Sequence, residues 1–178
     1  GGVLCADSTD GAGLMEDLIS KDLNVKGSNI VVLGAGGSSK AILPSLLKAE
    51  PKEVIIVNRT ISKAKNLAEI YNNDKVVVSH GSLIDEVPFE IDGLINTTSA
   101  GLLGQELIYP KNLFHFNPWS YDLSYGEKTT EFNELAIKNK ETVQGKIYNI
   151  GGGPNNTLSL LSLFDWFKET KDIQLKYD

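Results

Sequence analysis

The sequence predicts an α/β fold with a doubly wound, mostly parallel sheet. Short, continuous apolar runs alternate with segments whose apolar residues recur at helical spacing, and a glycine-rich loop joins one such run directly to the helical segment after it. Strands that helices cover on both faces consist of unbroken apolar residues, whereas a strand with one solvated face alternates apolar and polar residues. Repeated strand and helix units are therefore typical of a parallel sheet between two layers of helices.

The elements follow in order along the chain. The first expected helix, 11–22, places Leu14, Met15, Leu18 and Ile19 at helical spacing. The expected strands are 29–34, 52–58, 75–80, 90–98, 117–125 and 146–150. The expected helices between them are 39–50, which contains Pro44, 61–73, and 129–140, which opens on Thr130. A last helix, about 154–168, is apolar over most of its circumference and would need burial against more than one neighbour.

Length and composition suit a single globular domain, so residues 1–178 are expected to form one unit. The net charge of −6 argues against a nucleic-acid surface, which needs clustered cations. No apolar run reaches the roughly 18 residues of a membrane span, and a single cysteine fits a reducing compartment. His80 and His115 lack partners at metal-ligand spacing. We expect a cytoplasmic protein without nucleic-acid, membrane or metal partners.

The segment VVLGAGGSSKA, 31–41, carries the first functional signal. Its glycines follow a strand and precede a helix, where they permit a tight turn and let backbone N–H groups approach a pyrophosphate. Ser39 stands at the third small position of the usual dinucleotide fingerprint, a mild departure. A dinucleotide is therefore the expected ligand. The residues expected to bind it in this loop are Gly34, Ala35, Gly36, Gly37 and Ser38.

The tip of the second strand predicts which dinucleotide binds. In dinucleotide-binding folds an acidic residue binds the ribose hydroxyls about 20 residues after the first glycine. Asn58 lies close to that position after Gly34. Arg59 follows it, and a guanidinium pairs with a 2′-phosphate that a carboxylate would repel. Thr60 adds a hydroxyl and Lys63 a second cation, so NADP is expected over NAD. The alternative is an ordinary capped helix, with Thr60 as N-cap and Arg59 solvated.

Three motifs together resemble the cofactor-binding domain of the shikimate dehydrogenases, relatives of the quinate dehydrogenases. They are GAGGSSKA, VNRTISKA and DGLINTTSAGL, 92–102, and STDGAGL and YDLSYGEKTTEF extend the similarity from about residue 4 to about 168. The resemblance implies a Rossmann-type NADP-binding domain that lacks the family's N-terminal substrate domain. It also implies NADPH-dependent reduction of 3-dehydroshikimate to shikimate, a step of aromatic amino acid and chorismate biosynthesis.

The resemblance also implies roles for individual residues. Asp10 would be the catalytic aspartate that works with a lysine of the substrate domain, and Tyr125 would lie near substrate and nicotinamide. From the residues alone, the alternatives are that Asp10 is a helix N-cap and that small hydroxyl residues after the fourth strand cap a loop. The residues that the family would place at the nicotinamide end are Thr98, Ser99, Leu123 and Gly151.

Two departures from the family keep alternatives open. The domain that carries the family's lysine is not in this chain, and Leu158 stands where the family has a substrate-binding glutamine. The alternatives are a non-catalytic or diverged NADP-binding module, a dehydrogenase of quinate or another polyol acid and, more distantly, the NADP-binding part of a glutamyl-tRNA reductase. The apolar helix at about 154–168 is expected to dock toward the missing substrate domain, and it would promote a homodimer if it were exposed.

Overall fold

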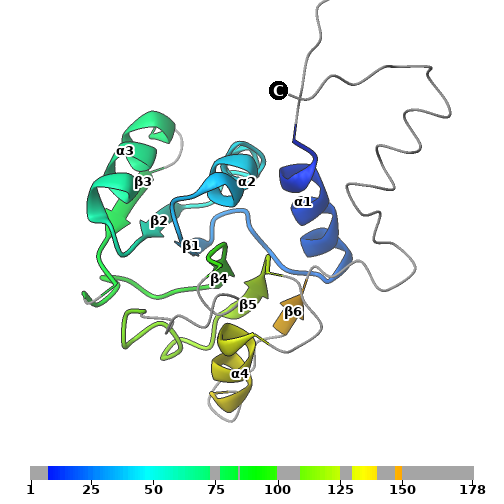
Figure 1. Cartoon of the computed structure of the whole chain (residues 1–178). Coiled ribbons are helices and arrows are strands. Elements are labelled where there is room, and N and C mark those ends of the chain that lie inside the picture. The colour runs from blue at the N-terminus through cyan, green and yellow to red at the C-terminus, as the bar shows by residue number, and fades with distance from the viewer. Residues whose placement is uncertain are drawn as a thin grey trace, which may run out of the picture.

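The computed structural model describes residues 8–72, 77–83, 85–99, 109–124, 130–139 and 147–149. Helices and strands alternate along these residues and form one layered unit (Figure 1). The elements are α1 (Asp10–Ser20), β1 (Asn29–Leu33), α2 (Gly37–Lys48), β2 (Glu53–Val57), α3 (Ile61–Tyr71), β3 (Val77–Gly81), β4 (Gly93–Asn96), β5 (Trp119–Asp122), α4 (Glu131–Lys138) and β6 (Ile147–Asn149). In this part of the chain no helix combines the length and the apolar character needed to cross a membrane.

The strands form one sheet in the order β3-β2-β1-β4-β5-β6, and every neighbouring pair is parallel. The chain moves outward from β1 to β3 and then returns to place β4 on the other side of β1. This confirms the doubly wound fold class predicted from the sequence. The reversal places a topological switch between β1 and β4, which is where open α/β sheets bind ligands.

The predicted elements agree with the observed ones apart from a few residues at their ends. The largest differences are in β5, which spans Trp119–Asp122 instead of 117–125, and in β4, which spans Gly93–Asn96 instead of 90–98. Just before the start of β4, the side chain of Asp92 accepts the Asn29 N–H at 2.7 Å, while the Asp92 N–H donates to the Asn29 carbonyl at 2.9 Å. The helix expected at about 154–168 lies outside the described residues.

Both faces of the sheet are buried, which explains the unbroken apolar strands. Ile30 and Val32 of β1 pack into one cluster with α1, α2 and α3, whereas Val31 and Leu33 pack into a second cluster with α4. Figure 1 shows the same division, with α1, α2 and α3 on one side of the strands and α4 on the other. The sheet is therefore the middle layer of the described fold.

Helix α2 continues through Pro44, as the sequence predicts. Proline has no N–H, so it leaves the carbonyl oxygen four residues earlier without its helical partner. That oxygen belongs to Lys40, and the hydroxyl of Tyr71 at the end of α3 donates to it at 3.3 Å. The neighbouring helix thus supplies a hydrogen bond to the carbonyl that the proline leaves free.

Helix α1 is attached to the rest of the fold at two points. Gly11 is buried against α2, where an added Cβ would lie 2.6 Å from Ser45 Oγ and 2.9 Å from the Ala41 carbonyl oxygen. Two turns further on, Asp17 accepts a hydrogen bond from the hydroxyl of Tyr121 in β5 at 2.6 Å. The first contact needs a residue without a side chain, and the second crosses the interior to the sheet.

Asp17 and Tyr121 alter each other's proton affinity. Burial acts to raise the pKa of Asp17, but hydrogen bonds from Lys21 and Tyr121, together with the Lys21 charge, outweigh it and hold the pKa below its ordinary 3.8. Burial, and then the hydrogen bond and negative charge of Asp17, raise the pKa of the Tyr121 phenol far above its ordinary value. Both shifts favour the pair of an ionised carboxylate and a neutral phenol.

We predict that Gly93→Ala destabilises the fold. A Cβ at Gly93 would lie under 3.0 Å from three atoms of the Trp119 indole, so the ring would have to move within a packed sheet. The free energy of unfolding in urea should fall by about 1–3 kcal/mol, which is usual for an overpacked core. The matched control is Gly13→Ala in α1, where the added methyl meets nothing within 4 Å. That variant should be unchanged or up to about 1 kcal/mol more stable, since alanine favours helix.

We predict that Tyr121→Phe lowers stability in a pH-dependent way. The hydrogen bond to Asp17 should contribute about 1–2 kcal/mol at pH 7. Because the pKa of Asp17 is lowered below 3.8 in the folded state, this contribution is complete above 3.8 and is lost as pH falls through the folded pKa. Urea unfolding across this range should show the difference from wild type shrinking at low pH. In the control Tyr71→Phe, the lost bond goes to a carbonyl oxygen that does not titrate, so its effect should stay constant.

Candidate functional site

The carboxyl ends of β1, β2, β4 and β5 bring most of the predicted site residues to one edge of the sheet. The glycine loop leaves β1 there, the Asn58–Thr60 segment leaves β2, and 97–99 follow β4. Because all strands are parallel, these segments emerge on the same side. The edge beside the switch between β1 and β4 is therefore the candidate site.

The glycine loop offers unoccupied backbone donors. Gly34 adopts a φ of +109°, which favours glycine, and its N–H donates to the Val57 carbonyl of β2 at 2.8 Å. Gly36 is the N-cap of α2, has no side-chain capping bond, and is followed by a first turn without acidic residues. The N-terminal N–H groups of α2 therefore face outward without a capping side chain, which is the arrangement that attracts a phosphate.

The tip of β2 presents two cations. Asn58 is held in place, because its N–H donates to the Gly81 carbonyl at 3.3 Å and its side-chain amide donates to the Thr60 carbonyl at 2.9 Å. Arg59 and Lys63 are exposed, and neither forms an ion pair with any residue of the described ranges. Lys65 on the same helix instead lies 3.9 Å from Glu69. The two free cations are thus those nearest the start of α3.

The alternative reading of this tip as a plain helix cap holds only in part. Thr60 is the N-cap residue of α3, but its side chain makes no capping hydrogen bond. No acidic side chain occupies the first turn of α3. The hydroxyl, the N–H groups of the first turn and the two cations together leave this helix end open to an anion.

The segment after β4 is fixed by its own side chains. Thr98 donates both its N–H and its hydroxyl to the side-chain oxygen of Asn96, at 3.1 and 2.8 Å. The expectation that small hydroxyl residues cap this loop is therefore correct for Thr98, whose ligand contact stays a prediction. Ser99 is exposed, and Leu123, after β5, donates its N–H to the Asn96 carbonyl at 2.9 Å.

Asp122 at the end of β5 is fully buried and was not singled out by the sequence. Its oxygens accept hydrogen bonds from the Asn96 amide and the Ser124 N–H, both at 2.9 Å, and from the Thr130 hydroxyl. The Thr130 oxygen in turn accepts the Asn133 N–H at 3.2 Å and so caps α4. A polar residue at the end of a buried strand was the available signal. Asp122 thus ties the ends of β4 and β5 to α4.

Asp10 lies apart from this network, as the first residue of α1. Its side chain is exposed, and its N–H donates to the Ser8 hydroxyl oxygen at 3.3 Å. The N-cap is Thr9, whose carbonyl accepts the Gly13 N–H at 2.9 Å, so the alternative that Asp10 is the N-cap is wrong. Tyr125 and Gly151 lie outside the described residues. The catalytic role of Asp10 stays a prediction.

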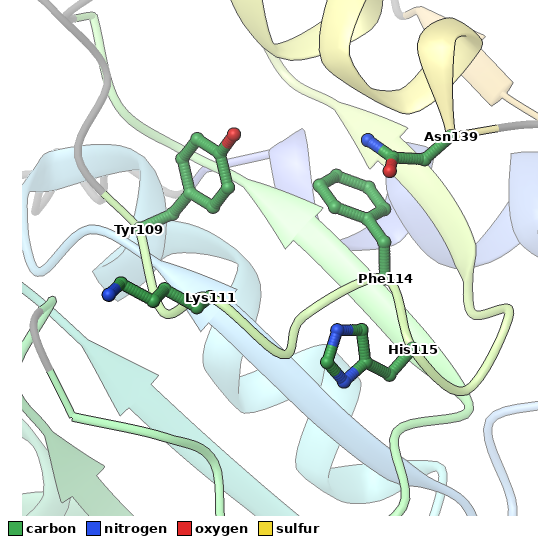
Figure 2. A pocket seen from close by; sticks show the side chains of 5 residues that line it. All are labelled: Tyr109, Lys111, Phe114, His115 and Asn139. Carbon is green, nitrogen blue, oxygen red and sulfur yellow. The ribbon is translucent and has the colours of Figure 1, made fainter.

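A separate hollow of about 270 Å³ lies away from this edge (Figure 2). Its walls are the segment that leads into β5 and the end of α4, so it belongs to the amino edge of the sheet. The Tyr109 and Phe114 rings pack edge to face, with 6.1 Å between their centroids. The lining residues are Tyr109, Lys111, Phe114, His115 and Asn139. Its position at the opposite edge separates it from the glycine loop and the cations of α3.

The described residues hold no group of three or more His, Cys, Asp or Glu side chains that could bind a metal ion. The chemistry of the carboxyl edge is instead that of two anion-attracting helix starts on neighbouring strands, one glycine-rich and one carrying free cations. This arrangement suits an extended ligand with phosphates at two separate places.

Comparison with known proteins identifies relatives of this chain. Shikimate dehydrogenase (NADP(+)) of Vibrio atlanticus is 37% identical over 142 residues, covering 78% of this chain and 49% of the relative. The Legionella pneumophila (strain Corby) protein of the same name is 40% identical over 134 residues, covering 75% and 48%. The chain therefore spans about half the length of these relatives.

Solved structures show the same fold. A shikimate dehydrogenase in complex with NADP+ is 30% identical, with a TM-score of 0.64, over 80% of this chain and 50% of that one. The shikimate dehydrogenase of Aquifex aeolicus is 28% identical, with a TM-score of 0.62, over 95% and 57%. The family described as shikimate / quinate 5-dehydrogenase matches residues 13–107. Since that match includes the glycine loop, the tip of β2 and the end of β4, the chain belongs to the shikimate/quinate 5-dehydrogenase family.

Proposed function

We propose that this chain is the NADP(H)-binding unit of an oxidoreductase that interconverts shikimate and 3-dehydroshikimate. The observation that carries the proposal is the pair of free cations, Arg59 and Lys63, at the tip of β2 beside the glycine loop of β1. Relatives of the chain are named as NADP(+) enzymes, and a structural neighbour is a complex with NADP+. The family and the local charge thus support the same cofactor.

The residues fit NADP in a definite direction. The N–H groups of residues 35–38, which include the start of α2, would hold the pyrophosphate, and Gly34 would let the loop approach it. Arg59, Lys63 and the hydroxyl of Thr60 would bind the 2′-phosphate, with Asn58 fixing the turn between them. The nicotinamide would then extend over the switch point toward Thr98, Ser99, Leu123 and Gly151. The part-buried hydrogen bonds of Thr98 to Asn96 would orient that end before the ligand arrives.

The bound nicotinamide supplies or accepts the hydride in this reaction. In the direction of reduction, the substrate oxygen must gain a proton as the carbonyl becomes an alcohol, and in the reverse direction it must lose one. We propose that Asp10 and a lysine outside residues 1–178 donate and accept this proton, with Tyr125 beside the substrate. A carboxylate next to an ammonium group can share a proton, since each charge shifts the other's proton affinity.

The second candidate is a diverged or non-catalytic NADP-binding module. Leu158 favours it, because a leucine cannot hydrogen-bond a substrate hydroxyl as the family's glutamine does. A dehydrogenase of quinate or another polyol acid is the corresponding alternative among active enzymes. We further propose a single domain over 1–178 whose apolar segment 154–168 docks toward the substrate domain, a cytoplasmic location and a homodimer.

We predict that Arg59→Asp weakens the binding of NADP+ far more than the binding of NAD+. The change removes a charge-assisted hydrogen bond to the 2′-phosphate and adds repulsion, so NADP+ affinity should fall on the order of a hundredfold. NAD+ affinity should change by about threefold or less, since that ligand has no 2′-phosphate. Calorimetric titration of both ligands measures this. Equal losses for the two would mean that Arg59 does not read the 2′-phosphate.

The matched control for Arg59→Asp is Lys65→Asp. It makes the same change in net charge two residues beyond Lys63, at a cation that faces Glu69. NADP+ affinity should change by about threefold or less, as expected for a screened charge that does not touch the ligand.

We predict that residues 1–178 alone bind NADP(H) but form no NADPH from shikimate, because the lysine partner of Asp10 is missing. Absorbance of NADPH measures this, and substantial turnover would overturn the assignment. Fusion behind the remaining half of the Vibrio atlanticus relative should restore turnover, and Asp10→Asn should abolish it again. A fusion that binds NADP+ yet stays inactive would favour the non-catalytic module.

A further inference from the structure

Two hydroxyl groups lie directly behind the glycine loop. Ser39, in the first turn of α2, has no exposed surface, and its hydroxyl donates to the Gly34 carbonyl at 2.9 Å. Thr97, just after β4, donates its hydroxyl to the Leu33 carbonyl at 2.6 Å. The two hydroxyl oxygens are 2.7 Å apart. We call Ser39 and Thr97 the hydroxyl latch.

The latch joins three segments of the carboxyl edge. Its two carbonyl acceptors belong to Leu33, the last residue of β1, and Gly34, the first residue of the loop. Its two hydroxyls come from α2 and from the end of β4. The Leu33 carbonyl also receives the Thr97 N–H at 2.9 Å. The start of the loop is therefore held both by the helix that follows it and by the neighbouring strand.

Gly34 and Thr97 fit each other sterically. A Cβ at Gly34 would lie under 3.0 Å from Thr97 Oγ1 and 3.2 Å from a methyl carbon of Thr98. With a φ of +109°, the loop turns over the Thr97 side chain as it leaves β1. The first glycine of the motif thus makes room for the latch as well as for a ligand.

We propose that Ser39 and Thr97 are positioning residues for the pyrophosphate of the dinucleotide. Ser39 is fully buried and the Thr97 hydroxyl is bound to the Leu33 carbonyl, so in this proposal both act through the loop and not by touching the ligand. By fixing the carbonyls of Leu33 and Gly34, they set the direction of the N–H groups that follow. The inference rests on the proposed function, because it concerns the same cofactor site.

The latch should affect only one end of the cofactor. Arg59 lies between β2 and α3 and Lys63 in the first turn of α3, whereas the latch joins β1, α2 and the end of β4. A ligand that carries the 2′-phosphate without the pyrophosphate should therefore be insensitive to it. Adenosine 2′-monophosphate is such a ligand.

The test measures NADP+ and adenosine 2′-monophosphate binding to residues 1–178 by calorimetry, the weaker ligand by competition. Thr97→Val keeps the shape and removes the hydroxyl, and Ser39→Ala removes the other. Each variant should lower NADP+ affinity about tenfold, which is the effect of one hydrogen bond. The affinity for adenosine 2′-monophosphate should stay within about twofold of wild type. Thr97→Ser keeps the hydroxyl and should bind NADP+ about as tightly as wild type.

Ser45→Ala is the control, since it removes a hydroxyl from α2 outside the latch. It should leave both affinities unchanged. NADP+ affinity equal to wild type in Thr97→Val and Ser39→Ala would overturn the latch, and so would equal losses for both ligands. If Thr97→Val does not fold, Ser39→Ala and Thr97→Ser decide the outcome. A folded wild-type chain that binds neither ligand would overturn the proposed cofactor function, and the latch with it.

Discussion

The carboxyl edge of the sheet depends on one buried side chain, the carboxylate of Asp122. A carboxylate removed from water is stable only when hydrogen bonds replace its hydration. The donors here come from three places: the Asn96 amide at the end of β4, the Ser124 N–H after β5, and the Thr130 hydroxyl at the start of α4. Satisfying this single group therefore fixes two strand ends and a helix start relative to one another.

From Asp122 the hydrogen bonds continue toward the glycine loop. Asn96 links Asp122 to Thr98, and Thr97 links the end of β4 to β1 and, through Ser39, to α2. These framework groups are paired with one another and largely buried. The exposed groups of the same edge are the N–H groups at the helix starts and the cations Arg59 and Lys63. They have no side-chain capping bond or ion-pair partner within the described ranges. The paired framework groups and the unpaired groups at the helix starts therefore belong mostly to different residues.

The same division explains how one edge can recognise a long ligand. Phosphate recognition needs N–H groups and cations that are held in place yet not neutralised by the protein itself. The structure meets this requirement at the starts of α2 and α3, which follow the adjacent strands β1 and β2. Neither helix has an acidic residue in its first turn. The network behind the loop supplies the rigidity, so the exposed groups are oriented before the ligand binds.

The sequence by itself determined the order and type of the elements, because buried parallel strands leave unbroken apolar runs and helices leave a 3.6-residue period. It also determined the glycine loop and the Asn58-Arg59-Thr60 tip, since both motifs are local. Only the tertiary structure decided that Thr9, and not Asp10, caps α1, and that Thr60 stays without a capping bond. It also revealed Asp122, Ser39 and Thr97, whose partners lie on other segments of the chain. Contacts between distant segments depend on how the strands are arranged side by side, and no local periodicity encodes that.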